Sequence, residues 1–242
     1  MRQIWQRIVQ TIALARLATR ISGGRMYWIV PLAPLVWPLV LILTQAFGQG
    51  ARAYAPHDAQ GVMATPLVVL AIALGARVIA GEADRRTLEI AYTVPGGAQR
   101  IWTAKLLSAA FWLAIALALL VPVTWLFLTA VPFSAVYGAY QAALVYLVLA
   151  TGLSAVTRSE VTGVLVTLAV LFLNGLFTGF GDMQLRISPF WNPLMLSRRN
   201  EVDPADVFTW TVQNRIFMGL AVTAFVALAY ARAERREKML AG

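Results

Sequence analysis

Apolar residues in this chain run in long stretches, and short polar segments separate them. A helix needs about 20 mostly apolar residues to cross the hydrocarbon core of a bilayer. Six stretches meet this requirement: 27–47, 62–81, 101–131, 134–156, 161–181 and 207–231. The pattern predicts an all-α membrane protein with six transmembrane helices, built as a single transmembrane domain over residues 1–242.

Proline modifies two of these predicted spans. Pro31, Pro34 and Pro38 all fall in the first stretch, which we therefore expect to be bent, because proline removes a backbone donor. The third stretch is longer than one crossing requires and contains Pro122. It either extends beyond the membrane or kinks at the proline.

The residues before the first span predict a different kind of helix. Positions 2–20 are too short and too polar to cross a membrane, but they segregate on a helical wheel. One face carries Ile4, Trp5, Ile8, Val9 and Ile12, and the other carries Arg2, Gln3, Gln6, Gln10 and Arg20. We expect an amphipathic helix lying in the membrane interface over 1–24, ended by Gly23-Gly24. A signal peptide is less consistent with the segment, which lacks a clean apolar core and a cleavage site.

Composition and charge place the chain in a membrane and orient it. Hydrophobic residues make up 60% of the 242 positions and charged residues 13%, against about 25% charged in soluble domains. Lysine and arginine favour the cytoplasmic side. Fifteen lie on one predicted side: Arg2, Arg7, Arg16, Arg20, Arg25, Arg77, Arg85, Arg86, Arg100, Lys105, Arg158, Arg232, Arg235, Arg236 and Lys238. The opposite side has Arg52, Arg186, Arg198 and Arg199. We expect a multi-pass protein of a bacterial-type inner (cytoplasmic) membrane, with both termini cytoplasmic. The net charge of +9 therefore belongs to the cytoplasmic loops of a membrane protein. We expect membrane lipids, and no nucleic acid, as partners.

The sequence contains few residues that could perform catalysis. It has no cysteine and a single histidine, His57, in a predicted loop. It also lacks the zinc-protease and serine-hydrolase motifs and a carboxylate pair within a span. We therefore expect no catalytic, metal-binding or cofactor-binding residue, and no enzymatic activity of the chain itself.

A charged segment over 82–97 stands between the second and third apolar stretches. Glu82 and Asp84 come first, and Glu89 follows Arg85 and Arg86 at helical spacing, which favours a short helix. Pro95-Gly96-Gly97 then turns the chain back towards the membrane. On charge alone, an ordinary solvated cytoplasmic loop would have the same appearance.

The order of residues in this segment resembles a signature of the type-2 exporter permeases of the ATP-binding-cassette (ABC) class. In that family a Glu-x-x-x-x-Thr-Leu-Glu stretch follows the second span, and a proline and a lysine come next. The corresponding residues here are Glu82, Thr87, Leu88, Glu89, Pro95, Ile101 and Lys105, with Arg86 in place of the usual glycine. The six spans, the amphipathic start and the large outer loop match the same family, so the resemblance covers nearly the whole chain.

The resemblance implies a coupling helix that docks on a separate nucleotide-binding ATPase subunit. Its contacts would be Glu82, Arg85, Arg86, Thr87, Leu88 and Glu89, with Arg158 in a second, smaller contact. ATP and Mg²⁺ would bind the partner, because this chain has no phosphate-binding loop. A second copy of the chain, or a homologous permease, would complete the translocation path of an exporter.

Two further features concern the opposite side. The segment 182–206 contains Phe190 and Trp191 in a run too apolar for a simple loop, and the resemblance implies a re-entrant segment near the exit. An ordinary loop carrying an interfacial tryptophan is the alternative. Arg215 lies about eight residues, or roughly 12 Å, into the last span. It either contacts an anionic substrate in the pathway, or snorkels or makes a structural contact.

Two other functions are compatible with the same pattern. One is a secondary transporter or channel driven by an ion gradient, which would call for acidic residues or broken helices near the midplane. The other is a membrane scaffold that does not transport anything. The residues do not specify a transported substrate.

Overall fold

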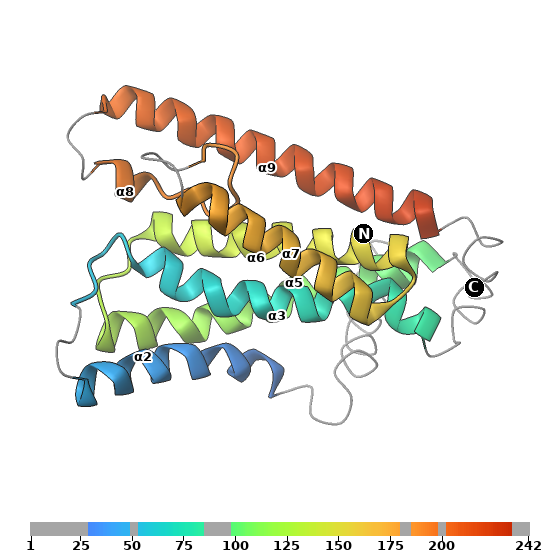
Figure 1. Cartoon of the computed structure of the whole chain (residues 1–242), viewed down its shortest axis with the longest axis horizontal. Helices are drawn as coiled ribbons and strands as arrows, with labels where there is room; N and C mark the ends of the chain where they lie inside the picture. The colour runs from blue at the N-terminus through green and yellow to red at the C-terminus, as the bar shows by residue number, and fades with distance from the viewer. Residues whose placement is uncertain (1–28, 49–52, 85–97, 180–184, 198–201, 234–242) are drawn as a thin grey trace, which may run out of the picture.

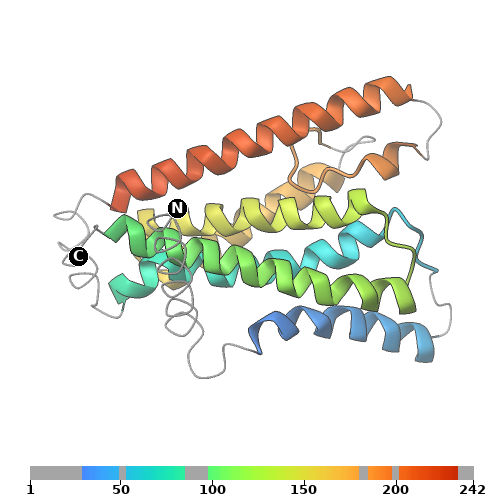
Figure 2. The same ribbon diagram turned by 180° about the vertical axis from the view of Figure 1, so that it is seen from behind.

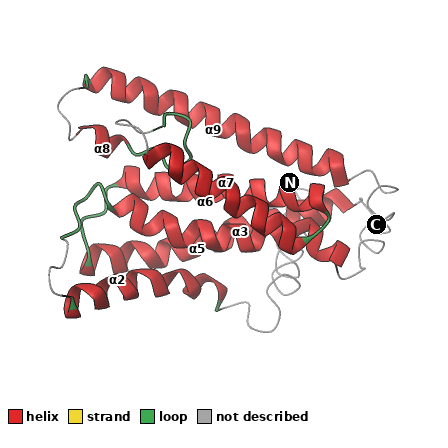
Figure 3. Ribbon diagram, viewed as in Figure 1, coloured by secondary structure: helices red, strands yellow, loops and turns green. Residues whose placement is uncertain are grey.

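A computed structural model of the chain describes residues 29–48, 53–84, 98–179, 185–197 and 202–233. The predicted interfacial helix over 1–24 and most of the predicted coupling segment, 85–97, lie outside these ranges. Within them every regular element is a helix (Figure 3). The elements are η2 (Val30–Leu35), α2 (Val36–Phe47), α3 (Ala59–Asp84), α5 (Ala98–Phe127), α6 (Phe133–Thr157), α7 (Glu160–Gly179), α8 (Pro193–Ser197) and α9 (Pro204–Ala233).

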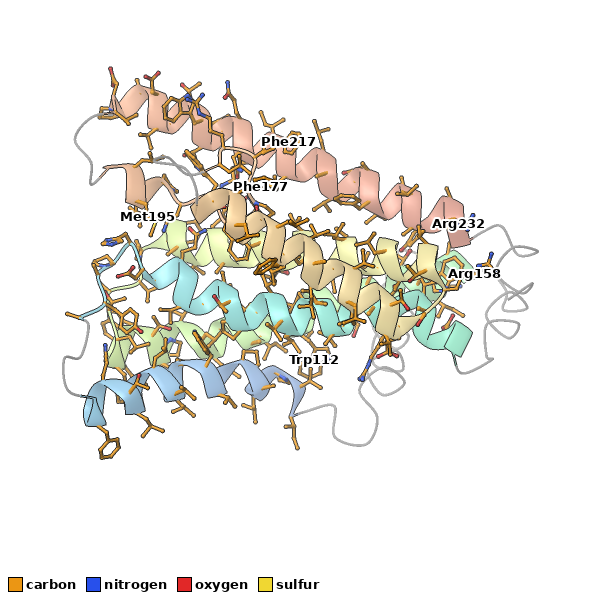
Figure 4. All side chains as sticks on the ribbon, viewed as in Figure 1. Trp112, Arg158, Phe177, Met195, Phe217 and Arg232 are labelled. Atoms are coloured by element: carbon orange, nitrogen blue, oxygen red, sulfur yellow. The ribbon has the colours of Figure 1, made fainter. Side chains whose placement is uncertain are left out.

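Six of these helical stretches are long and apolar enough to cross a membrane, with η2 and α2 together forming the first. They confirm the prediction of an all-α, multi-pass membrane protein. The long helices run along one common direction, with α9 on one outer side and α2 on the opposite side (Figures 1 and 2). Arg158 and Arg232 lie at one end and Met195 at the other (Figure 4). We call these the Arg158 end and the α8 end.

The prolines have different effects in the two spans. Around Pro31 and Pro34 the first span is a 3-10 helix that becomes α-helical at Val36, and the expected bend stays a prediction. Pro122 instead lies inside one continuous α-helix of 30 residues, α5. That helix covers 98–127 rather than the predicted 101–131, and at about 45 Å it is longer than the hydrocarbon core is thick.

Helices α3 and α6 form the centre of the bundle and pack along each other more extensively than any other pair. Small residues make this possible, since the main core cluster is rich in alanine from α3, α5 and α6. The closest approach is at Gly75, where a Cβ atom would collide with the carbonyl oxygen of Leu147. The hydroxyl of Thr151 donates to the Gly75 carbonyl oxygen there, at 3.0 Å. Glycine at position 75 thus allows the two backbones to touch.

The peripheral helices expose large apolar side chains on their outer faces. Examples are Leu43 of α2, Phe111 of α5, Phe172 of α7 and Leu220 of α9. In a water-soluble protein such a surface would be a liability, whereas in a bilayer it is the surface that lipid covers.

Candidate functional site

A buried ion pair joins the end of α3 to the beginning of α5. The Lys105 ammonium lies 2.5 Å from Oε1 of Glu82, and the two side chains are only 6% and 12% exposed. The indole Nε1 of Trp102 donates to Oε2 of Glu82 at 3.1 Å. Lys105 also donates to the Val78 carbonyl oxygen at 3.4 Å. Both carboxylate oxygens and the ammonium therefore have partners inside the bundle, as a buried charge pair requires.

The helical geometry explains how these groups meet. Glu82 lies one turn after Val78 on α3, and Lys105 follows Trp102 by three residues on α5, so each pair shares a face. Trp102 packs in a second apolar cluster with residues from four helices: Val78, Ile79, Ala98, Ala155 and Ala229. In addition, the hydroxyls of Thr103 and Tyr230 lie 3.0 Å apart, which links α5 to the last turn of α9. The ion pair is thus attached to α3, α5, α6 and α9.

A second charge pair lies at the same end but is more exposed. Arg77 Nε is 2.6 Å from Oε1 of Glu160, with the side chains 50% and 26% exposed, and it connects α3 to the start of α7. Arg158 stands just before α7, as the residue that ends α6, with the positive φ of 57°. Sequence reasoning did not find either ion pair, although four charged residues near the ends of apolar spans signal a need for partners.

The predicted coupling contacts therefore divide into three groups. Arg85, Arg86, Thr87, Leu88 and Glu89 lie outside the described residues. Glu82 is described, and its carboxylate is occupied inside the chain, so it ties together the helices on either side of segment 85–97. Arg158 lies at the same end of the bundle (Figure 4). Direct contact of any of these residues with an ATPase stays a prediction.

At the α8 end, the connection between α7 and α9 folds back against the bundle. It consists of turns over 185–192 followed by the five-residue helix α8. Trp191 is 1% exposed, packs against Leu196 and Val207, and donates its Nε1 hydrogen to the Thr211 hydroxyl at 3.0 Å. The Phe190 ring lies 5.8 Å from that of Tyr146 on α6. Trp191 is therefore a core residue of this end and does not lie on the outer surface of the chain. Whether the segment is re-entrant or an ordinary loop stays a prediction.

Three amide side chains hold this connection, and sequence reasoning missed all of them. Gln60 donates to the carbonyl oxygens of Phe190 and Trp191, at 3.2 and 3.1 Å. Asn214 donates to those of Arg186 and Ser188, at 2.8 and 3.0 Å. Within the connection itself, Asn192 donates to the His57 carbonyl oxygen at 2.8 Å. Irregular backbone in an apolar setting must have its polar groups satisfied, and these amides provide that.

Arg215 joins the same set of hydrogen bonds. Its NH1 donates to Oε1 of Gln141 at 2.7 Å, and its guanidinium carbon lies 4.6 Å from the centre of the Tyr137 ring. The Gln141 amide in turn donates to Oδ1 of Asn214 at 3.1 Å. Arg215 therefore makes a structural contact with α6, one of the two roles predicted for it. This contact does not test a role in the pathway.

The predicted residues thus form two groups at opposite ends of the bundle. Glu82 and Arg158 are at the Arg158 end, while Phe190, Trp191 and Arg215 are at the α8 end. Among the described residues, no group of three or more histidine, aspartate or glutamate side chains is placed to hold a metal ion. Comparison with protein-family models finds no match, and comparison with curated proteins finds none either.

Proposed function

We propose that this chain is the membrane-spanning permease subunit of an ATP-driven ABC exporter, with the Arg158 end in the cytoplasm. The observation that carries the proposal is the buried pair of Glu82 and Lys105. It joins the two helices that flank segment 85–97, the segment whose residue order resembles a coupling helix. A force applied to that segment would move α3 and α5 together instead of separating them.

Charge supports the proposed orientation. At the Arg158 end the described residues include Arg77, Arg100, Lys105, Arg158 and Arg232. At the α8 end the corresponding cations are Arg186 and Arg215, beside the acidic residues Asp58, Asp203 and Asp206. This is the asymmetry expected when the Arg158 end faces the cytoplasm.

The chain requires a partner to use ATP, because its sequence has no phosphate-binding loop. In the proposed assembly, two copies of this chain, or this chain and a homologous permease, form the path and two ATPase subunits bind segment 85–97. ATP-driven closure of the ATPases would then be transmitted as a rigid-body movement of helices. Phe190 and Trp191 would lie near the exit.

Co-purification tests the proposal. The affinity-tagged full chain is isolated from membranes of its native host, and the eluate is assayed for ATP hydrolysis and for a bound protein with a phosphate-binding loop. We expect both with the wild type and neither with the variant Arg86→Glu/Leu88→Asp. The matched control is Arg236→Glu/Leu240→Asp, which makes the same chemical changes in the C-terminal tail and should keep both. Equal ATPase recovery from all three chains, with equal membrane insertion, contradicts the proposal.

A further inference from the structure

Within the part of the chain that the structure describes, the guanidinium of Arg215 contacts uncharged groups. These are the Gln141 amide oxygen and the face of the Tyr137 ring. Among the described residues, the ion pairs with carboxylates involve His57, Arg77 and Lys105, not Arg215. A half-buried cation on a membrane-spanning helix is costly without an anion. A negatively charged ligand bound to Arg215 would therefore stabilise this arrangement.

A chain of amides fixes the position of this cation. Asn214 must direct its NH₂ group to the carbonyl oxygens of Arg186 and Ser188, which leaves its oxygen as the acceptor for Gln141. The Gln141 oxygen is then turned to Arg215. Because the backbone carbonyls can only accept, each amide in the series has one possible orientation. The guanidinium is therefore held in place before any ligand arrives.

Most of the hydrogen-bond donors of Arg215 remain available. A guanidinium has five N–H donors in a planar fork, and one nitrogen of Arg215 donates to Gln141. Its nitrogens are absent from the buried polar atoms without partners, and the side chain is partly exposed. The free donors thus reach the outer surface of the bundle, in the fork geometry that suits a phosphate group.

The surface around Arg215 changes along the bundle axis. Towards the α8 end it has exposed aromatic rings, those of Phe133 and Tyr137 on α6 and Phe208 on α9. Towards the middle of the bundle, α9 exposes apolar residues, among them Ile216, Phe217 and Leu220. Tyrosine typically marks the headgroup level of a bilayer, and Tyr137 is the ring that contacts the guanidinium. The cation thus lies between a headgroup-level tyrosine and an apolar surface of α9.

We propose that Arg215, held by Gln141 and Tyr137, binds the phosphate of an anionic phospholipid from the bilayer at the groups that face outward between α6 and α9. The phosphate accepts from the free guanidinium donors, and the acyl chains lie on the exposed apolar surface of α9. A free phosphate ion offers the same anion, but it has no apolar part for the surface beside the cation. This site is independent of ATP-driven transport.

Native mass spectrometry of the purified full chain in detergent tests this site. The probes are phosphatidylglycerol and phosphatidylcholine with identical acyl chains, each titrated until the first lipid binds, and inorganic phosphate as competitor. We expect the wild type to prefer phosphatidylglycerol by roughly tenfold, because both lipids offer a phosphate to the guanidinium but phosphatidylcholine also brings a trimethylammonium cation that opposes the positive charge of Arg215. Inorganic phosphate should compete weakly. Displacement of the lipid by equimolar inorganic phosphate would overturn the assignment to a lipid headgroup.

Three variants separate Arg215 from general charge effects. Arg215→Gln should lose the preference, and Arg215→Lys should keep part of it because the charge remains without the fork. Arg186→Gln is the matched control, since Arg186 is also a cation at the α8 end and lies 3.6 Å over the Trp210 ring. It should keep the full preference. All chains are compared at equal monodispersity in size-exclusion chromatography. An unchanged preference in folded Arg215→Gln, or its loss in Arg186→Gln, refutes the proposal.

Discussion

Lys105→Met should destabilise the bundle far more than a typical loss of one surface charge. The variant removes the ammonium group from a site in which it is 6% exposed, so the Glu82 carboxylate loses its charged partner and keeps the indole of Trp102 as a neutral donor. Breaking a buried pair by deleting one partner costs about 3–5 kcal/mol, because the remaining charge is uncompensated. At about 1.4 kcal/mol for each factor of ten, the folded population should fall by at least a hundredfold relative to the unfolded one.

The double variant Glu82→Gln/Lys105→Met should recover most of this loss, because it removes both charges and keeps an acceptor for Trp102. Arg77→Met is the matched control. Its pair with Glu160 is 50% and 26% exposed, and pairs of that kind contribute about 0–1 kcal/mol. The measurement is the free energy of unfolding of the purified chain in mixed micelles, titrated with a denaturing detergent and followed by circular dichroism. If Lys105→Met costs no more than Arg77→Met, or the double variant is no more stable than the single one, the reasoning about burial is wrong.

Three other changes have definite expected outcomes. Gly75→Ala should cost about 1–3 kcal/mol in the same unfolding assay, because it overpacks the contact of α3 with α6. At Gly61 a Cβ meets nothing within 4 Å, so Gly61→Ala should be neutral or stabilising by up to about 1 kcal/mol. Arg158→Gly should leave the stability unchanged or raise it by up to about 1 kcal/mol, since φ is 57° there, and a large loss of stability would contradict the role of φ. The same variant should weaken ATPase binding if the side chain makes the predicted contact. For topology, the absence of native cysteine allows single-cysteine labelling with an impermeant thiol reagent. In intact cells the reagent should react with Ile187→Cys, because Ile187 is 56% exposed. It should reach Lys238→Cys only after the membrane is opened. The reverse labelling would invert the orientation.

The sequence predicts the spans well because each one is a long apolar run bounded by polar residues. Hydrophobicity alone decides where such spans lie. It predicts the helix ends less well. Pro122 lies inside α5, which continues through it as one helix, and a kink there stays a prediction. The pattern also placed the third span over 101–131, although the helix ends at Phe127. Nothing in the local sequence distinguishes these cases, because tertiary packing and neighbouring groups compensate for a missing donor.

The side-chain sites were predictable only in part. Glu82 and Lys105 were both singled out as parts of the family signature, and Glu82 also for contact with an ATPase. Their pairing was not predicted, because 23 positions separate them and the contact depends on how α3 and α5 meet. Gln141 and Asn214 carried a signal that went unused: an amide inside an apolar span needs a partner. Asn214 binds backbone carbonyls of an irregular segment, and Gln141 binds two side chains of another helix. No residue pattern specifies these partners in advance.

That choice of partners has a consequence for how the α8 end can vary. Gln60, Asn192 and Asn214 hold the chain by main-chain oxygens, which are present whatever residue occupies the position. Through these bonds Gln60 of α3 and Asn214 of α9 recognise the path of the segment, whereas Trp191 and Asn192 are held through their own side chains. Exposed positions such as Ile187 can be exchanged without losing any of these hydrogen bonds. A fixed scaffold with a replaceable surface is well suited to diversification, in natural sequences or in a designed library.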